Sequence, residues 1–309
     1  MILVCGEALF DLFAEDGDGG TLTLDARIGG SPFNVAIGLA RLEVPVAYFG
    51  GLSRDFFGRR LKAALEREGV DTSLVIDSDA LTTLSVVGLD ASGSPAYSFY
   101  GEGAADRLVT PGDLPALAEG IDTIHLGSFS ALVPPVGDAL LHLVRREHGR
   151  RLVAYDPNIR PTVVADLAAW RGRLDDLLPH VDLLKISAED AQTLYPGTDP
   201  AELARDWLAR GPALVVVTRG REGASAFTAI STASVAGRPV TVADTVGAGD
   251  TFQAALLARL GDTAARSRAG LSGLGEDALA DLLEYAGRAS AITCTRRGAD
   301  LPRRAELAA

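Results

Sequence analysis

The most informative residues of this chain are 244–252, which read Asp244-Thr245-Val246-Gly247-Ala248-Gly249-Asp250-Thr251-Phe252. Gly247 and Gly249 let the backbone turn with its N–H groups pointing outward. Residues 251–257 have the composition of a helix, and the first turn of a helix exposes further N–H groups. A glycine turn that leads into a helix predicts a binding site for an anion such as a phosphoryl group.

Asp250 lies beside this predicted anion site. A carboxylate is electrostatically unfavourable there unless it is needed as a proton acceptor. A lone Asp at the start of a helix more often serves as its N-cap, so that alternative stays open. The two glycines in front of it favour catalysis. We therefore expect a catalytic group made of Gly247, Ala248, Gly249 and Asp250.

The length and composition of the chain fit one α/β domain over residues 1–309. No linker is visible among the 309 residues, and the hydrophobic fraction of 47% allows a large core. No apolar run reaches the ~18 residues that a membrane helix needs. The chain starts with the strand-like Met1-Ile2-Leu3-Val4 and shows no secretory signal, so we expect a cytoplasmic protein.

The net charge of −12 argues against nucleic acid or an anionic membrane as a partner, which leaves a small molecule. Lys62 and Lys185 are the only lysines, and neither lies in a P-loop, so backbone N–H groups, arginines or Lys185 must hold any phosphate. Cys5 and Cys294 lack metal-ligand spacing and are expected to be free thiols. We expect structural roles for the histidines, at positions 125, 142, 148 and 180.

The hydrophobic pattern alternates short β-branched runs with helical stretches, which predicts a parallel sheet covered on both faces. The expected strands are residues 2–4, 46–49, 123–126, 152–155, 183–186 and 214–218. The expected helices are residues 34–42, 59–68, 137–147, 188–195, 200–210, 251–260 and 276–295. Residues 12–28 and 81–100 alternate differently and predict a small antiparallel sheet that stands off the main body.

Five polar motifs follow the predicted strands or precede helices, at positions that a parallel sheet brings to one edge. They are residues 6–11 (GEALFD), 29–34 (GGSPFN), 156–160 (DPNIR), 185–190 (KISAED) and 218–223 (TRGREG). Each motif alone is weak, because a glycine pair or Asp-Pro-Asn is ordinarily a turn.

Together the motifs resemble the PfkB (ribokinase-like) family of carbohydrate kinases over essentially the whole chain. Residues 29–36 are similar to the family's N-terminal signature and residues 244–257 to its C-terminal signature. Within the family, residues 6–11, 99–107, 156–160 and 294–302 resemble bacterial fructokinases most. The resemblance implies a three-layer αβα sandwich with a mainly parallel sheet and a β-sheet lid, the lid segments lying at about 12–28 and 81–107.

The resemblance also implies roles for single residues. Sugar-binding residues would be Asp11, Gly29, Gly30, Asn34 and Arg160. ATP-binding residues would be Lys185, Thr218, Gly220, Gly223, Gly247 and Gly249. From the residues alone, Asn34 can instead be a helix cap, Asp11 a turn residue and Arg160 a surface ion-pair partner.

Two cation sites follow from the same resemblance. Glu189 and Asp190 match the place where relatives organise magnesium through water, but Ser187 stands where Asn is frequent and Asp190 where Glu is, so either carboxylate remains a candidate. A possible potassium site would use Asp244 and the backbone carbonyls around Val246 and Thr293. The alternative is that Asp244 only caps the turn.

The implied reaction is transfer of the ATP γ-phosphoryl group to a sugar hydroxyl, with D-fructose giving D-fructose 6-phosphate and Asp250 as general base. The alternatives are a 2-keto-3-deoxygluconate kinase, a nucleoside kinase and a catalytically silent sugar or nucleotide sensor. Kinases of the keto-deoxy acid resemble this chain but carry an Arg after the lid aromatic pair, where this chain has Gly101 after Tyr100. Arg107 is expected at the surface or at the lid hinge. A homodimer is possible.

Overall fold

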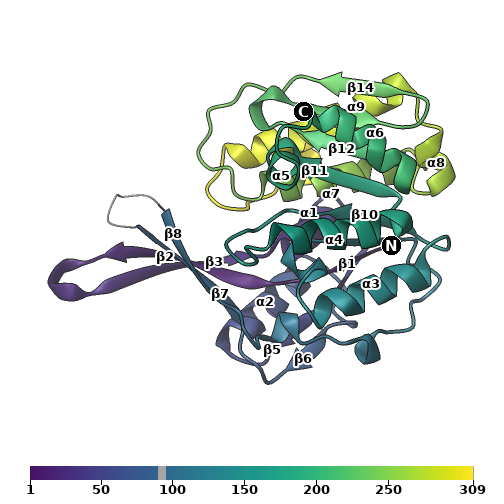
Figure 1. The fold of residues 1–309 in the computed structure, drawn as a ribbon. Coiled ribbons are helices and arrows are strands. Elements are labelled where there is room, and N and C mark those ends of the chain that lie inside the picture. Colours follow the sequence, from purple (N-terminus) through teal and green to yellow (C-terminus); the bar gives the residue numbers. More distant parts are fainter. Residues whose placement is uncertain (90–94, 309) are drawn as a thin grey trace.

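The computed structural model describes residues 1–89 and 95–308, and within them eight strands form one large sheet (Figure 1). The strand order is β14-β13-β12-β11-β10-β9-β1-β4. The bounds are β1 Ile2–Cys5, β4 Val46–Phe49, β9 Thr123–Gly127, β10 Leu152–Asp156, β11 Leu183–Ser187, β12 Leu214–Thr218, β13 Ala224–Phe227 and β14 Thr232–Val235. All six predicted strands are present and parallel, whereas the antiparallel strands β13 and β14 were not predicted.

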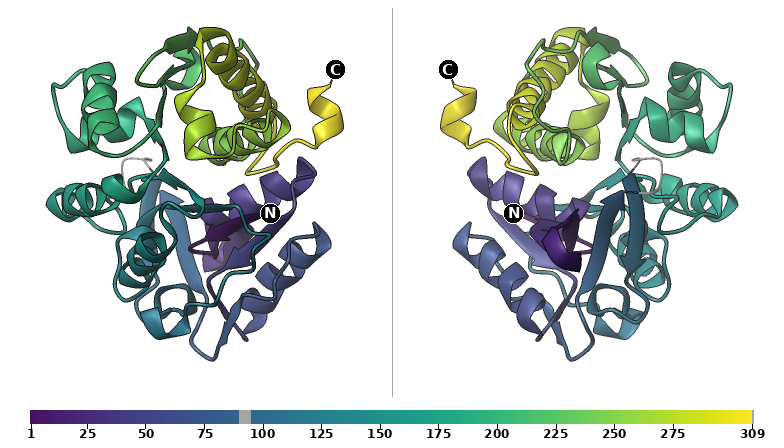
Figure 2. Two further views of the ribbon diagram at one scale, coloured as in Figure 1. Left: turned by 90° about the vertical axis from the view of Figure 1, so that its right-hand side faces the viewer. Right: turned by 90° about the vertical axis from the view of Figure 1, so that its left-hand side faces the viewer.

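Helices cover both faces of this sheet, so two hydrophobic cores form, one on each side (Figure 2). One core contains side chains of α1 Ser31–Arg41, α2 Phe56–Arg67, α7 Ala248–Asp262, α8 Arg268–Ser272, α9 Glu276–Cys294 and α10 Arg304–Leu307. The other contains side chains of α3 Val136–Glu147, α4 Leu167–Leu177, α5 Ala188–Leu194 and α6 Pro200–Arg210. Trp170 and Trp207 are fully buried in the second core.

Helix starts differ from the prediction at the two places that matter for the site. Helix α1 begins at Ser31 rather than residue 34, with Gly30 as its N-cap and Pro32 in the first turn. Proline suits this position because the first N–H groups of a helix have no partner within it. Helix α7 begins at Ala248, and Gly247 is its N-cap with φ +76°. Asn34 and Asp250 are therefore not N-caps, and the capping alternatives for both are wrong.

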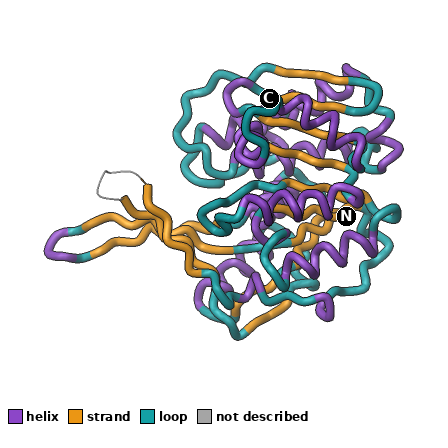
Figure 3. The backbone as a smooth tube through the Cα atoms, in the orientation of Figure 1, coloured by secondary structure: helices purple, strands orange, loops and turns teal. Residues whose placement is uncertain are grey.

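A second sheet forms a lid that projects from the body, as the orange strands of Figure 3 show. Its strand order is β3-β2-β7-β8, and the bounds are β2 Leu9–Asp16, β3 Leu22–Gly29, β7 Thr83–Leu89 and β8 Pro95–Tyr100. The predicted small sheet is present, but it is not antiparallel throughout as predicted, because its central strands β2 and β7 pair in parallel. Residues 90–94 of the predicted segment lie outside the described residues. A short parallel pair, β5 Gly51–Ser53 and β6 Ile76–Ser78, was not predicted.

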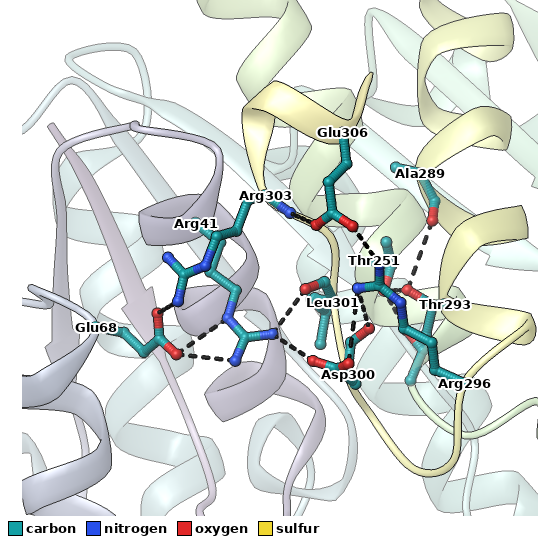
Figure 4. A network of polar contacts seen from close by, with 11 residues as sticks. Arg41, Glu68, Thr251, Ala289, Thr293, Arg296, Asp300, Leu301, Arg303 and Glu306 are labelled. Carbon is teal, nitrogen blue, oxygen red and sulfur yellow. Dashed lines mark hydrogen bonds and ion pairs between the residues drawn. The ribbon is translucent and has the colours of Figure 1, made fainter. Parts of the chain in front are cut away.

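A polar network ties the C-terminal segment to the rest of the fold (Figure 4). Arg41, at the end of α1, pairs with Glu68 at 2.8 Å and with Asp300 at 2.8 Å. The Thr251 and Thr293 hydroxyls, 2.9 Å apart, join α7 to α9 in the buried interior. The contact between Thr251 and Thr293 ties the start of α7 to α9. No helix within residues 1–89 and 95–308 is long and apolar enough to cross a membrane.

Candidate active site

The predicted motifs gather at the carboxyl edge of the parallel strands. Strand β1 lies between β9 and β4, and the chain leaves it toward β4 before returning to β9 on the other side. A crevice forms at such a switch point because the loops after the two neighbouring strands diverge. The loops after β1, β9 and β10 each contribute residues to one cavity there.

This first cavity, which we call the lid-side cavity, has a volume of about 380 Å³. It is lined by all five predicted sugar-binding residues, Asp11, Gly29, Gly30, Asn34 and Arg160. It is also lined by residues that were not predicted, among them Glu7, Ser31, Ser85, Phe99, Ser128, Phe129 and Asn158. Glu7, Ser31 and Phe99 lie within the quoted motifs next to predicted residues. Ser85, Ser128 and Phe129 have no local sequence signal.

A second cavity, the α9-side cavity, has a volume of about 940 Å³ and is mostly apolar. It is lined by the predicted Thr218, Gly220, Gly223 and Gly249. Its other walls are residues 235–242 and one face of α9, including Gly287 and Cys294. Thr245 and Gly249 line both cavities. The two cavities therefore meet at the glycine turn.

Asp250 stands at this junction, in the first turn of α7, and is only 9% exposed. Its Oδ1 accepts a hydrogen bond from the Ser31 hydroxyl at 2.7 Å, and its Oδ2 accepts one from the Asn34 amide at 2.8 Å. Burial raises the pKa of Asp250, and the hydrogen bonds from Asn34 and Ser31 oppose that rise. A buried carboxylate with a raised pKa is suited to accept a proton.

Close approach of the backbone requires a glycine at position 30. Gly30 has φ +104°, and a Cβ there would lie 2.7 Å from the Glu7 carbonyl oxygen. A Cβ on Gly29 would lie 2.4 Å from Asp11 Oδ2. Burial raises the pKa of Asp11, against the effects of a hydrogen bond from Ser85 and the nearby Arg160 charge. The motif thus places a carboxylate, an amide and backbone groups around one cavity, as a polyol requires.

A family model described as pfkB family carbohydrate kinase matches residues 1–305. The chain belongs to this family. It is 39% identical over 260 residues to a fructokinase of Rhizobium leguminosarum bv. trifolii, which covers 84% of this chain and 79% of that protein. It is 35% identical over 264 residues to a fructokinase of Klebsiella pneumoniae, which covers 84% of each chain. The prediction of a carbohydrate kinase is confirmed.

The structure is similar to solved pfkB-type kinases. A fructokinase of Xylella fastidiosa with bound ATP aligns with a TM-score of 0.90 and 26% identity, over 99% of this chain and 96% of that chain. A fructokinase of Vibrio cholerae O395, in a form with bound fructose, ADP and calcium ion, aligns with a TM-score of 0.83 and 28% identity, over 99% and 97% of the chains. The predicted ribokinase-like fold is confirmed.

The two carboxylates that the pfkB resemblance offers for a divalent cation differ in their surroundings. Glu189 is exposed. Asp190 is half-buried, and burial together with the nearby Asp156 charge raises its pKa to about 6. Asp156 Oδ2 accepts a hydrogen bond from Lys185 Nζ at 2.6 Å, while its buried Oδ1 has no partner among the described residues. The two candidates thus differ in exposure, and Asp190 is the one whose carboxylate interacts with the Asp156 charge.

Lys185 lies beneath the glycine turn and is 4% exposed. A Cβ on Gly249 would lie 3.3 Å from its Nζ, so the ammonium group lies next to the glycine turn that forms the predicted anion site. It lies outside the walls of both cavities. Its ammonium group is also paired with the Asp156 carboxylate at 2.6 Å, which offsets part of its positive potential at the turn.

Asp244 takes the capping role, one of the two that the sequence left open. Burial raises its pKa, but N–H groups of Gly298, Val246 and Thr245 outweigh that effect, so the pKa is lowered and the group stays anionic. Its Oδ2 accepts from Gly298 N at 2.8 Å and its Oδ1 from Val246 N at 3.1 Å, so Asp244 does cap the turn. The carbonyl of Thr293 accepts from Arg296 N at 3.0 Å.

Arg107 is half-buried and not a surface residue, and it lies in the turn Ala105–Arg107 that follows the lid strand β8. Its guanidinium carbon lies 5.0 Å from the ring centroid of Phe99 and 5.1 Å from that of Phe129, both of which line the lid-side cavity. A Cβ on Gly101 would lie 2.8 Å from Arg107 Nη2, so this glycine makes room for the arginine. Tyr100 is 64% exposed. The arginine thus supports the cavity's aromatic wall from behind.

The histidines and cysteines lie where structural roles were expected. His125 is fully buried, and burial lowers its pKa to about 3. The rings of His148 and His180 pack edge to face at 5.4 Å between centroids. No histidine lines either cavity within the part of the chain that the structure describes. Cys5 and Cys294 are free thiols, of which Cys294 lines the α9-side cavity.

Proposed function

We propose that this chain is an ATP-dependent kinase that converts D-fructose to D-fructose 6-phosphate, with Asp250 as the general base. The observation that carries this proposal is the position of Asp250, where a polar cavity of sugar size meets a larger apolar cavity suited to a nucleotide. The fructokinase names of the two relatives support fructose as the substrate. We also propose that residues 1–309 act as one unit.

In this mechanism the sugar lies among Asp11, Gly30 and Asn34, with Arg160 at the rim of the lid-side cavity. Asp250 takes the proton of the attacking sugar hydroxyl. The hydroxyl oxygen forms a bond to the γ-phosphorus of ATP, and the bond between that phosphorus and the ADP oxygen breaks. The N–H groups of Gly247 and Gly249 have no backbone acceptor among the described residues and stabilise charge on the phosphoryl oxygens. The N–H of Ala248 donates to Thr245 O at 3.2 Å and would be shared with the phosphoryl group.

ATP lies in the α9-side cavity in this proposal, with its phosphates toward Gly249. Thr218, Gly220 and Gly223 form one wall, and the apolar residues of 235–242 and α9 receive the base. Lys185, whose ammonium group lies next to Gly249, would strengthen the binding of phosphate at the anion site. Closure of the lid over the sugar would exclude water, which is a competing acceptor for the phosphoryl group.

Two cations fit the residues present. Asp190, beside the unpartnered Oδ1 of Asp156, would hold the waters of a magnesium ion, which neutralises phosphate charge when bound. Asp244 and the carbonyls around Val246 and Thr293 would hold a potassium ion close to the turn, since Asp244 remains anionic. Potassium should raise activity relative to a tetraalkylammonium salt of equal strength. A flat response would remove this site from the proposal.

We further propose a cytoplasmic enzyme and, as an open possibility, a homodimer. The lid supports the second point, because Leu22 and Leu24 on β3 are 59% and 44% exposed. Exposed apolar side chains on a projecting sheet are typical of an interaction surface. Sedimentation of the protein with Leu22→Ser and Leu24→Ser would show whether this face associates.

A coupled ADP-release assay over a panel of sugars tests the proposed function. The panel needs fructose, 2-keto-3-deoxygluconate, ribose and nucleosides, each with ATP and magnesium. We expect the highest kcat/KM with fructose. Preference for another acceptor would replace the substrate but keep the kinase, whereas binding of sugar and ATP without ADP release would favour a silent sensor.

A further inference from the structure

Ser31 is buried, and its hydroxyl links α1, near the start of the chain, to α7, much later in the sequence. It is the first residue of α1 and 7% exposed, and its Oγ donates to Asp250 Oδ1 at 2.7 Å across 219 residues of sequence. The partner on the other side, Asn34 Nδ2, holds Oδ2. The carboxylate is therefore fixed at both oxygens before any substrate arrives.

Glu7 holds Ser31 from behind. It follows β1 and is 1% exposed, and its Oε1 accepts a hydrogen bond from the Ser31 backbone N–H at 3.3 Å. The Glu7 carbonyl also touches Gly30, where a Cβ would come within 2.7 Å. An acceptor at the N-terminus of a helix is favourable because the first N–H groups have no partner inside the helix. Side chain and backbone of Glu7 together fix where α1 begins.

We propose that Ser31, held in place by Glu7, is a positioning residue that orients the Asp250 carboxylate and favours its ionised form. This inference rests on the proposed role of Asp250 as the general base. A hydrogen bond donated to a carboxylate stabilises the charged form and fixes the plane of its oxygens. A general base must present a lone pair to the sugar hydroxyl. If the Asp250 carboxylate could rotate freely, kcat would therefore fall while substrate binding would change little.

Other charges also face Asp250 and must be considered. Lys185 on β11 and Asp156 on β10 act on it with opposite signs, and Asn34 on α1 is neutral. Glu7, Asp11 and Arg160 line the same cavity. Replacing Ser31 by alanine changes none of these charges, so a shift in the titration of the base can be assigned to the lost hydroxyl.

The test is the pH profile of kcat/KM for fructose in Ser31→Ala and Ser31→Thr. Loss of the hydroxyl should move the acid limb to higher pH by about half a unit to one unit. At pH values below the limb, kcat should fall about fivefold while the KM for fructose changes less than threefold. Ser31→Thr keeps a hydroxyl and should restore the wild-type limb, which a purely structural role would not require.

Glu7 provides the second, independent test. Glu7→Gln keeps an oxygen that accepts from the Ser31 N–H, and Glu7→Ala does not. We expect Glu7→Ala to shift the acid limb as Ser31→Ala does, and Glu7→Gln to shift it less. In this proposal both residues act on the base through the same hydrogen bond, from Ser31 Oγ to Asp250 Oδ1. The double variant Ser31→Ala/Glu7→Ala should therefore lose no more activity than either single variant. Losses that multiply would overturn the proposal.

Asp250→Asn, measured in the same assay, separates this inference from the proposed function. If Asp250→Asn is inactive and the acid limb of Ser31→Ala coincides with that of the wild type, the positioning role is wrong and the base stands. If Asp250→Asn keeps near wild-type turnover, both are wrong. If Ser31→Ala fails to fold, as judged by thermal unfolding, the comparison of Glu7→Ala with Glu7→Gln decides the question.

Discussion

The two cavities that meet at the glycine turn differ in size and in the side chains that line them. The lid-side cavity is small and lined by ionisable or amide side chains such as Asp11, Asn34 and Asp250. The α9-side cavity is larger and lined mostly by glycines and apolar side chains from 235–242 and α9, although Arg221, Glu222, Arg238 and Glu284 also line it. Polar recognition needs particular residues at particular places, whereas an apolar slot needs only shape and room. Substitutions in the first cavity should therefore affect chemistry and specificity, and those in the second should affect nucleotide affinity.

Asp250→Asn should produce the largest effect. The amide keeps the shape and the contacts near Ser31 and Asn34 but cannot accept a proton, so kcat should fall by about 10²–10⁴. Affinities for ATP and fructose, measured by calorimetry, should stay within about tenfold. Turnover close to that of the wild type would show that the lid-side cavity binds without supplying the base.

Substrate choice should show the next largest effect. Gly101 follows the lid aromatic pair, so no arginine stands at that position, and Arg107 packs on Phe99 and Phe129 outside the cavity wall. Arg160 does line the cavity, but it comes from the loop after β10 and not from the lid. A buried carboxylate without a dedicated cation is costly to desolvate. Fructose should therefore exceed 2-keto-3-deoxygluconate in kcat/KM by at least about tenfold, or ~1.4 kcal/mol. Equal rates under the same ATP and magnesium would mean that Arg160 or Arg107 reaches the acid.

The sequence predicted the lid-side cavity better than the α9-side cavity, for a physical reason. Short motifs with fixed spacing, such as residues 29–34, place several polar groups in one turn and can be read locally. The apolar wall of residues 235–242 and α9 is assembled from positions far apart, and none of them carries a distinctive side chain. Ser85 and Phe129 were likewise missed, because only the tertiary fold brings them to the cavity.

The same contrast holds for the fold. Each parallel strand is an apolar run buried on both faces, so all six were predicted. Strand β14 was missed because it is short and lies at the edge of the sheet, where three of its four residues are not buried. Strand β13 is buried throughout but is also only four residues long. Helix α4 was missed because Gly172 and neighbouring arginines interrupt its apolar pattern, although Asp166 caps it through the N–H groups of Ala168 and Ala169.

Two substitutions of one glycine can test the α9-side cavity separately from the lid-side cavity. Gly287 lies within α9 and lines this cavity, and a Cβ there would meet nothing within 4 Å. Gly287→Leu should place its side chain in the cavity and raise the KM for ATP about tenfold, with the KM for fructose within about twofold. Gly287→Ala should leave the KM for ATP nearly unchanged and stabilise the helix by about 0.5–1 kcal/mol.

Gly172 supplies the matched control. It lies in α4 on the surface, a Cβ there would also meet nothing within 4 Å, and it lines neither cavity. Gly172→Leu should leave both KM values unchanged. An equal rise in the KM for fructose in Gly287→Leu would contradict the separation of the two cavities.

The smallest expected effect is on the stability of the protein and not on its rate. It concerns Glu7, a residue of the lid-side cavity alone. Burial raises the pKa of Glu7 to about 7, against the lowering effect of the Ser130 and Ser128 hydroxyls, and the nearby Asp106 raises it further. The folded protein therefore holds a proton that the unfolded chain, with a Glu pKa near 4.5, releases. The favourable contribution is complete below pH 4.5 and is lost as the pH rises toward about 7.

Glu7→Gln should remove this loss, since the amide is neutral at every pH. We expect the Tm of Glu7→Gln minus that of the wild type to be greater at pH 8 than at pH 5 by about 3 °C. Glu119→Gln, the same change of charge on an exposed side chain, controls for the general relief of negative charge in a protein of net charge −12. A difference independent of pH in Glu7→Gln would mean that Glu7 is ionised throughout, so that its contact with the Ser31 N–H rather than its burial dominates.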